Sequence, residues 1–193
     1  MTIRNLEYLL APKSVAMIGA SPEPGSVGLV VTRNLRSGGF KGPIWLVNPR
    51  HTDIDGVPCY ASVDALPGTP DLAVIATPPH TVPGLIEELG RKGTRAAVVI
   101  TAGVRGDLQQ AMLNAAKPNL LRIQGPNCIG LMVPGIGLDA SFSHRRPLPG
   151  DLAFLSQSGA LVTAVIDWAA DRQIGFSHVV SLGDMADVDF GDL

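Results

Sequence analysis

The sequence predicts an α/β fold: a doubly wound parallel sheet, followed by the truncated start of a second α/β domain. Hydrophobic residues make up 46% of the 193 residues and charged residues 17%, which suits a buried sheet covered by helices on both faces. From Ser14 to Ile123, short apolar runs alternate with helix-length amphipathic segments. This alternation is typical of βαβ units. The length allows one complete domain and the opening of another.

The first domain is expected to cover residues 1–135. Its short apolar runs predict strands at Ser14–Ile18, Ile44–Val47, Leu72–Ala76, Ala97–Ile100 and Leu121–Ile123. The amphipathic segments between the runs predict helices at Val27–Ser37, Val82–Arg91 and Asp107–Ala116. Gly38 and Gly93 follow the first two helices, where glycine commonly ends a helix. Right-handed crossovers would join these elements into one doubly wound sheet.

The pattern changes after Gly125. Residues 136–150 are rich in Pro and Gly, show one candidate strand at Gly137–Ser141, and are expected to form a linker. A second βαβ pattern occupies residues 151–193, with a strand at 151–155, a helix at 159–172 and a strand at 177–182. One such unit cannot bury its own sheet, so it either belongs to a longer protein or packs back onto the first domain. From Asp187 the sequence predicts the first turn of another helix.

Composition excludes several classes of function. The net charge is −2 and the basic residues are scattered, so we expect no nucleic-acid partner. No run approaches the length of a membrane span and no export signal is visible, so we expect a cytoplasmic protein with no membrane partner and reduced thiols. The four histidines lack metal-ligand spacing and predict no metal site. For the acidic residues Asp184, Asp187, Asp189 and Asp192, a solvated helix N-terminus is at least as good an explanation as a cation site.

The first strand runs into a glycine-rich loop that opens a helix. Its candidate phosphate-binding residues are Gly19, Ser21, Gly25, Ser26, Val27 and Gly28. Unpaired backbone N–H groups and the positive end of a helix dipole collect at such a turn, so a diphosphate can bind there. The alternative is an ordinary strand-to-helix turn with a serine cap.

The second strand ends in Asn48, Pro49 and Arg50. An NAD site needs a carboxylate at this point to bind the ribose hydroxyls, and none is present. Arg50 could instead pair with a ribose-attached phosphate, which NADP and coenzyme A both possess. A solvated loop arginine is the alternative reading.

Three further strands end in candidate ligand-binding residues, because doubly wound folds bind ligands at the carboxyl ends of their strands. These residues are Thr77, Pro78, Pro79, Ala102, Gly103, Asn127 and Cys128. The Asn127 amide could orient a polar ligand group. Cys128 could act as a nucleophile only beside a group that lowers its pKa, and the interpretation as a small packing residue is preferred.

A second strand, hydroxyl-rich turn and helix contains Ser156, Gln157, Ser158 and Gly159. The same physics predicts a second anion-binding turn. The alternative is a plain serine N-cap. Two such turns in one chain suggest two phosphate-bearing species, or one group passed between sites.

Four motifs, in order along the chain, resemble the ADP-forming acyl-CoA synthetases, including the α subunit of succinyl-CoA synthetase. They are Ser14–Ser21, Val47–Pro49, Gly125–Gly130 and Ser156–Leu161. The resemblance covers essentially the whole chain. It implies a Rossmann-like CoA-binding domain and the start of a flavodoxin-like α/β domain. In that family, acid, CoA and ATP become acyl-CoA, ADP and phosphate through an acyl phosphate and a phosphohistidine.

The resemblance also implies roles for the candidate residues. The loop from Ser21 to Gly28 would hold the CoA diphosphate, and residues 48–50 would border the adenosine end. Residues 77–79 and 102–103 would line the pantetheine path, with residues 126–128 near the thiol. The turn of residues 156–159 would receive the phosphohistidine or the acyl phosphate.

The family pattern places the phosphorylated histidine downstream of Leu193, so no catalytic residue is expected in this chain and the fragment alone is not competent. ATP, ADP and Mg²⁺ would bind only to an ATP-grasp domain or subunit of the parent protein, and a homo-oligomer is compatible with the resemblance. Gly183-Asp184 replaces the Gly-Asn of many ligases, and Gly103-Val104-Arg105 lacks their Phe and nearby Glu. The Asp184 variant is similar to ligase-like regions fused to protein lysine acetyltransferases. Two alternatives therefore stay open: a regulatory CoA or acyl-CoA sensor, and an NADP-binding oxidoreductase domain.

Overall fold

The first sheet of the protein has seven strands and its order reverses beside β1. The structure, a computed structural model, describes residues 3–193, and the sheet order is β3-β4-β2-β1-β5-β6-β7. All neighbouring strands are parallel except the edge pair β3–β4. The bounds are β1 Val15–Ile18, β2 Ile44–Val47, β3 Asp53–Ile54, β4 Val57–Tyr60, β5 Leu72–Ile75, β6 Ala96–Val99 and β7 Arg122–Gln124. This order confirms the doubly wound α/β prediction.

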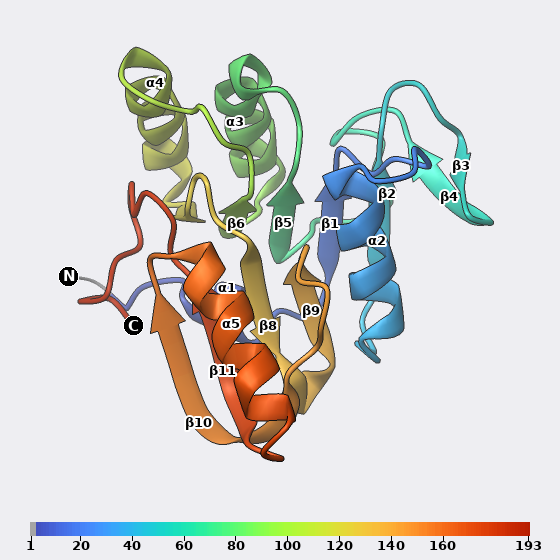
Figure 1. Cartoon of the computed structure of the whole chain (residues 1–193). Coiled ribbons are helices and arrows are strands. Elements are labelled where there is room, and N and C mark those ends of the chain that lie inside the picture. Colours follow the sequence, from blue (N-terminus) through green and yellow to red (C-terminus); the bar gives the residue numbers. More distant parts are fainter. Residues whose placement is uncertain (1–2) are drawn as a thin grey trace.

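Helices cover the two faces of this sheet unequally (Figure 1). Helices α3 and α4 lie on one face, while α2 lies on the other. The strands alternate accordingly, since Ala16 and Ile18 face the α3 side and Val15 and Met17 the opposite side. The helical bounds are α1 Glu7–Leu10, α2 Val27–Ser37, α3 Val82–Lys92 and α4 Asp107–Ala116, with single 3₁₀ turns at Pro79–Thr81, Lys117–Asn119 and Pro134–Ile136.

A second, four-stranded sheet has the order β10-β11-β8-β9. Its strands are β8 Gly130–Val133, β9 Leu138–Ser141, β10 Leu148–Ser156 and β11 Gly175–Ser181, and helix α5 spans Gly159–Ala170 between the parallel strands β10 and β11. Residues 136–150, expected as a linker, therefore contain β9 and the start of β10. The candidate strand at 137–141 is present, and it pairs antiparallel with β8.

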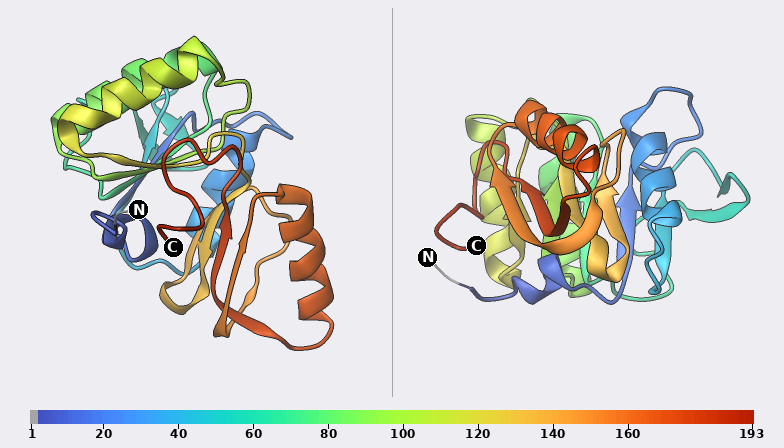
Figure 2. Two further views of the ribbon diagram at one scale, coloured as in Figure 1. Left: turned by 90° about the vertical axis from the view of Figure 1, so that its left-hand side faces the viewer. Right: turned by 60° about the horizontal axis from the view of Figure 1, so that its bottom comes forward.

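The two sheets share one hydrophobic core. Leu131 and Ala140 of the second sheet pack in the same cluster as Met17 and Val98 of the first. Helix α5 covers the other face of the second sheet, as the two views of Figure 2 show. The second βαβ unit thus packs back onto the first domain, which supplies the apolar surface that one unit alone lacks.

Buried polar side chains fasten the second sheet and the C-terminal segment to β7. The amide of Gln124 is fully buried and donates to Gly130 O at 2.9 Å and to Ser181 O at 2.8 Å. The guanidinium of Arg122 pairs with Asp187 at 3.0 Å and with Asp192 at 2.8 Å. The helix predicted from Asp187 is absent, since residues 187–193 are irregular apart from a bend and one turn. The solvated-terminus interpretation of this acidic cluster was wrong for Asp187 and Asp192, which neutralise a buried arginine.

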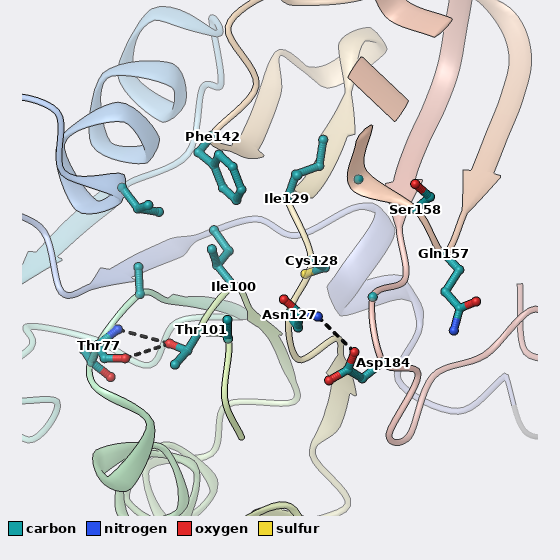
Figure 3. A pocket seen from close by; sticks show the side chains of 15 residues that line it. Thr77, Ile100, Thr101, Asn127, Cys128, Ile129, Phe142, Gln157, Ser158 and Asp184 are labelled. Carbon is teal, nitrogen blue, oxygen red and sulfur yellow. Dashed lines mark hydrogen bonds between the residues drawn. The ribbon is translucent and has the colours of Figure 1, made fainter. Parts of the chain in front are cut away.

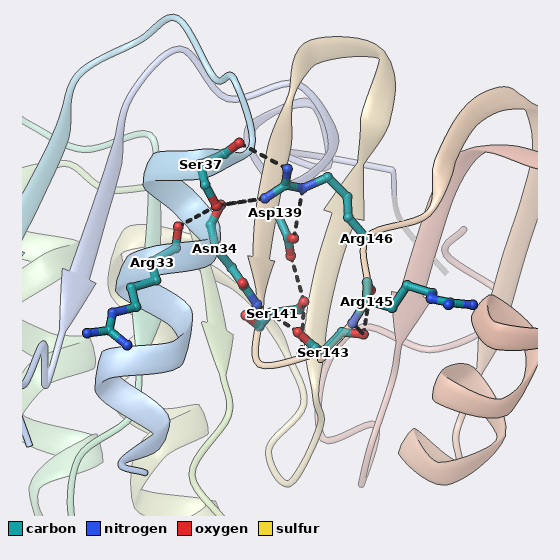
Figure 4. A network of polar contacts seen from close by, with 8 residues as sticks. All are labelled: Arg33, Asn34, Ser37, Asp139, Ser141, Ser143, Arg145 and Arg146. Atoms are coloured by element: carbon teal, nitrogen blue, oxygen red, sulfur yellow. Dashed lines mark hydrogen bonds and ion pairs between the residues drawn. The ribbon is translucent and has the colours of Figure 1, made fainter. Parts of the chain in front are cut away.

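A polar network joins the C-terminal end of α2 to the second sheet (Figure 4). The Asn34 amide donates to Ser141 O at 2.9 Å, and Arg146 donates to Ser37 O at 2.9 Å. Arg146 also pairs with the buried Asp139 carboxylate at 3.3 Å. Burial raises the pKa of Asp139, and the hydrogen bond from Ser141 and the charge of Arg146 oppose that rise. The negative end of the α2 dipole also stabilises the positive charge of Arg146 at this position.

Candidate functional site

Two adjoining cavities lie along the carboxyl ends of the parallel strands. The first, here called the switch-point cavity, has a volume of about 630 Å³ and lies where β2, β1 and β5 end. The second, the intersheet cavity, has a volume of about 760 Å³ and is lined by residues of both sheets. Ala76 and Thr77 line both cavities, so the two adjoin at the end of β5. Sheet topology places ligands at this point, because the strand order reverses between β1 and β5.

Six predicted residues line the switch-point cavity: Gly19, Asn48, Pro49, Arg50, Thr77 and Pro78. The Asn48 side chain also braces the cavity wall, since its Nδ2 donates to Ala20 O at 2.7 Å and its Oδ1 accepts from Arg50 N–H at 2.8 Å. The Arg50 side chain is exposed at the rim. Asn48 thereby fixes the backbone of Arg50, the residue predicted to pair with a ribose-attached phosphate.

The intersheet cavity collects predicted residues from both halves of the chain (Figure 3). They are Val27, Thr77, Ala102, Asn127, Cys128, Gln157, Ser158 and Gly159. The hydroxyl of Thr101 donates to Thr77 O at 2.8 Å and accepts from Thr77 N–H at 3.2 Å, so it ties together the ends of β5 and β6. The N-terminal residues of α2 and α5 lie on the same cavity, so their positive dipole ends are close to it.

Two glycines of the first loop allow close backbone contacts. Gly19 has φ +90°, and a Cβ there would overlap the Ala76 carbonyl oxygen and lie 2.9 Å from Thr77 Cγ2. A Cβ at Gly28 would overlap the Gly19 carbonyl oxygen. Ser26 caps α2 by accepting from Leu29 N–H at 3.2 Å. These contacts hold the start of α2 against the end of β1, as an anion-binding turn requires.

Seven predicted residues do not line either cavity. Ser21, Gly25, Ser26 and Gly28 shape the loop beside the cavities, and Ser21 Oγ accepts from Glu23 N–H at 3.1 Å. The other three are Pro79, Gly103 and Ser156. Ser156 is buried at the end of β10 and accepts from Ser158 N–H at 3.1 Å. Ser158 itself caps α5 by accepting from Leu161 N–H at 3.3 Å. The serine N-cap predicted as the alternative for this turn is therefore present.

Asn127 and Cys128 face different partners. Asn127 Nδ2 donates to Asp184 Oδ1 at 3.1 Å, so its amide already has one protein partner. The Cys128 thiol is buried and donates to Val99 O at 3.5 Å. Burial raises the pKa of Cys128 to about 12, which favours the small-residue interpretation over a nucleophilic thiolate.

We expect Cys128 to resist alkylation in the native protein. A pKa near 12 instead of 9.0 makes its thiolate about a thousandfold scarcer, and the side chain is buried. Cys59 is only half-buried, although burial raises its pKa too. Iodoacetamide followed by peptide mass spectrometry should label Cys59 first in the native chain and both cysteines in urea. Native labelling of Cys128 as fast as Cys59 would contradict this assignment.

Several lining residues were not predicted as site residues. Thr101, Ile129, Phe142 and Asp184 line the intersheet cavity, and His80 lines the switch-point cavity. Thr101 lies just after β6 and could have been found by the strand-end rule that gave Ala102. Phe142 follows β9, and only the packing of the two sheets brings it to the cavity, so no local signal marks it.

The described residues contain neither a group of ligands suited to a metal ion nor a helix able to span a membrane. The fold and the cavities along its strand ends define a nucleotide-binding α/β protein. The family described as CoA binding domain matches residues 13–134, and the family described as succinyl-CoA ligase like flavodoxin domain matches residues 149–193. The chain therefore belongs to the CoA-binding domain family.

Curated relatives locate the chain more closely. It is 43% identical to the ADP-forming acetate–CoA ligase I of Archaeoglobus fulgidus over 97% of this chain and 28% of that protein. It is 40% identical to the α subunit of the corresponding Pyrococcus furiosus enzyme over 98% of this chain and 43% of that subunit. The chain thus matches the N-terminal, α-subunit portion of ADP-forming acetyl-CoA synthetases, and spans less than half the length of these relatives.

Solved structures agree with this placement. The dinucleotide forming acetyl-coenzyme A synthetase 1 of Ca. Korarchaeum cryptofilum superimposes with a TM-score of 0.92 and 38% identity, over 97% of this chain and 42% of that one. The same protein has been solved in complex with phosphate and ADP. The comparisons confirm the resemblance and favour neither the sensor nor the oxidoreductase alternative.

Proposed function

We propose that this chain binds coenzyme A along the two adjoining cavities and forms the CoA-binding portion of an ADP-forming acid–CoA ligase. The observation that carries the proposal is the pair of adjoining cavities, one reaching from Arg50 to the β1/β5 switch point and the other from there to Cys128 and the start of α5. A long, flexible ligand with a phosphorylated nucleoside at one end and a thiol at the other suits such a pair of cavities. Each cavity has the volume usual for a ligand pocket.

The switch-point cavity would hold the adenosine end. Asn48 and Pro49 border it, and Arg50 at the rim would pair with the ribose-attached phosphate. The diphosphate would lie against the loop of residues 19–28, where the N-terminus of α2 presents backbone N–H groups. The close packing of Gly19 and Gly28 fits this role, because a side chain at either position would overlap a backbone carbonyl oxygen and disrupt the turn.

The intersheet cavity would hold the reactive end. Pro78, in the neighbouring switch-point cavity, would guide the pantetheine together with Thr77 and Ala102, and Asn127 and Cys128 would lie beside the thiol. Gln157, Ser158 and Gly159 would face the phosphate-bearing group that meets the thiol, because the start of α5 opens onto the same cavity. CoA supplies the thiol that accepts the acyl group, while the residues of this chain bind and orient it.

We further propose that the parent protein supplies the phosphorylated histidine and an ATP-grasp partner that binds ATP, ADP and Mg²⁺. A subunit partner is consistent with the Pyrococcus relative, which is an α subunit. We retain the cytoplasmic location as a prediction from the sequence.

Titration calorimetry of the chain with CoA, acetyl-CoA, NAD and NADP tests the binding proposal. CoA and acetyl-CoA should bind, and the nicotinamide dinucleotides should not. Tight binding of NADP with none of CoA would overturn it.

Arg50→Ala should weaken the binding of CoA by about 1 to 3 kcal/mol and leave the binding of dephospho-CoA unchanged, because only CoA carries the ribose-attached phosphate that would pair with Arg50. Binding of both ligands is measured by calorimetry. Arg36→Ala, which removes an equal charge from α2 outside both cavities, is the matched control. Equal losses for both ligands would refute the role of Arg50.

A further inference from the structure

Among the described residues that line the switch-point cavity, Glu88 has the one carboxylate. It lies half-buried on α3 and was not predicted as a site residue. Leu85 precedes it by three residues, so both side chains share one side of the helix and line the cavity. An ionised carboxylate can only accept hydrogen bonds, so one that faces a ligand cavity favours a ligand with a donor at that point.

No protein group within residues 3–193 donates to this carboxylate. Every ion pair of that range is made by an aspartate, and none of its hydrogen bonds ends on Glu88. Lys92, one turn further along α3, donates instead to Asp64 O at 3.1 Å and to Leu66 O at 3.2 Å. The Glu88 carboxylate therefore has acceptor capacity that a bound ligand can use.

Glu88 and Arg50 lie on different sides of the switch point. Arg50 follows β2, whereas Glu88 belongs to the helix after β5, and β1 lies between these two strands. A ligand whose phosphate pairs with Arg50 can therefore extend its base toward α3 and keep the phosphate away from the carboxylate. Val63 and Leu85 add apolar lining to the cavity, which suits a planar base.

We propose that Glu88 accepts a hydrogen bond from the exocyclic amino group of adenine and thereby selects the base at the adenosine end of the ligand. This inference rests on the proposed function, because it takes the adenosine end to lie in the switch-point cavity. The amino group of adenine is a hydrogen-bond donor, and purine without that group offers no donor in its place. Loss of the donor would leave the carboxylate unpaired against the base, which lowers affinity.

Titration calorimetry with CoA, and with a CoA analogue that carries purine in place of adenine, tests the role of Glu88. The native chain should bind CoA about tenfold more tightly than the analogue. A hydrogen bond to a charged group is strong, but solvent competes for this half-buried carboxylate and limits the ratio. In Glu88→Met, which keeps the length of the side chain and removes the acceptor, the ratio of the two dissociation constants should fall to near 1.

Glu87→Met is the matched control. It removes an equal charge from the exposed side of α3, outside both cavities, and should keep the native ratio. A fall of the ratio in this variant as well would assign the effect to net charge and overturn the inference.

The remaining outcomes separate the inference from the proposed function. A native chain that binds the two ligands equally, or a Glu88→Met variant that keeps the native ratio, overturns the inference while CoA binding stands. Binding of neither ligand by the native chain overturns the proposed function and the inference together.

Discussion

Gly19→Ala should lower the free energy of unfolding by about 3 to 5 kcal/mol and abolish CoA binding. The new Cβ would occupy the space of the Ala76 carbonyl oxygen and lie 2.8 Å from Ala76 C, so the backbones of two adjacent strands would have to part. The φ of +90° adds strain for any residue with a side chain. Overpacking against backbone has no flexible side chain to absorb it. Urea unfolding gives the stability, and calorimetry gives the binding.

Gly25→Ala is the matched control, because Gly25 has a similar φ of +78° but a Cβ there would have no neighbouring atom within 4 Å. Strain alone should cost about 1 to 2 kcal/mol there. If the two variants lost the same stability, the close contact between β1 and β5 would not be the reason that position 19 needs glycine.

Arg122→Met should lower the free energy of unfolding by about 2 to 4 kcal/mol. The Arg122 and Asp192 side chains are 4% and 5% exposed, and removing one partner of a buried pair leaves the other charge poorly solvated. The C-terminal segment could move to hydrate Asp192, but the fully buried Val188 would then leave the shared core. Methionine keeps most of the arginine stem volume, so urea unfolding reports mainly the lost charge.

Arg33→Met provides the comparison at the surface. Arg33 pairs with Asp55 at 3.6 Å, and the two side chains are 63% and 42% exposed. Exposed pairs contribute little, so the loss should stay below about 0.5 kcal/mol. A loss for Arg122→Met as small as this would mean that the C-terminal segment is not anchored by the ion pair.

The sequence was sufficient for the central parallel strands β1, β2, β5, β6 and β7 and for the longer helices, because those elements carry their own apolar pattern. The β3–β4 hairpin was missed, although Asp55-Gly56 is a typical hairpin turn and both residues have positive φ. Its first strand has two residues and its second contains Pro58, so neither shows a clear pattern. The four-residue helix α1 is too short for periodicity to mark it.

The site was predictable where it follows the strand-end rule and not where it depends on the stacking of two sheets. Asn48, Thr77 and Ala102 follow parallel strands, so topology alone predicts their position. Phe142 and Ile129 reach the cavity only because β8 and β9 belong to the second sheet. No local periodicity encodes that pairing, since it joins segments about 50 residues apart, as in β8 and β11.

The shared core also means that the two family matches are not separable pieces of the folded chain. Strand β8 lies inside the first match, yet it is hydrogen-bonded between β9 and β11 of the second sheet. A cut between residues 134 and 149 would leave β11 without this neighbour and would uncover the α2-side face of the first sheet. In this chain each piece of such a cut would expose apolar surface that the shared core now buries, and neither piece should keep the stability of the whole.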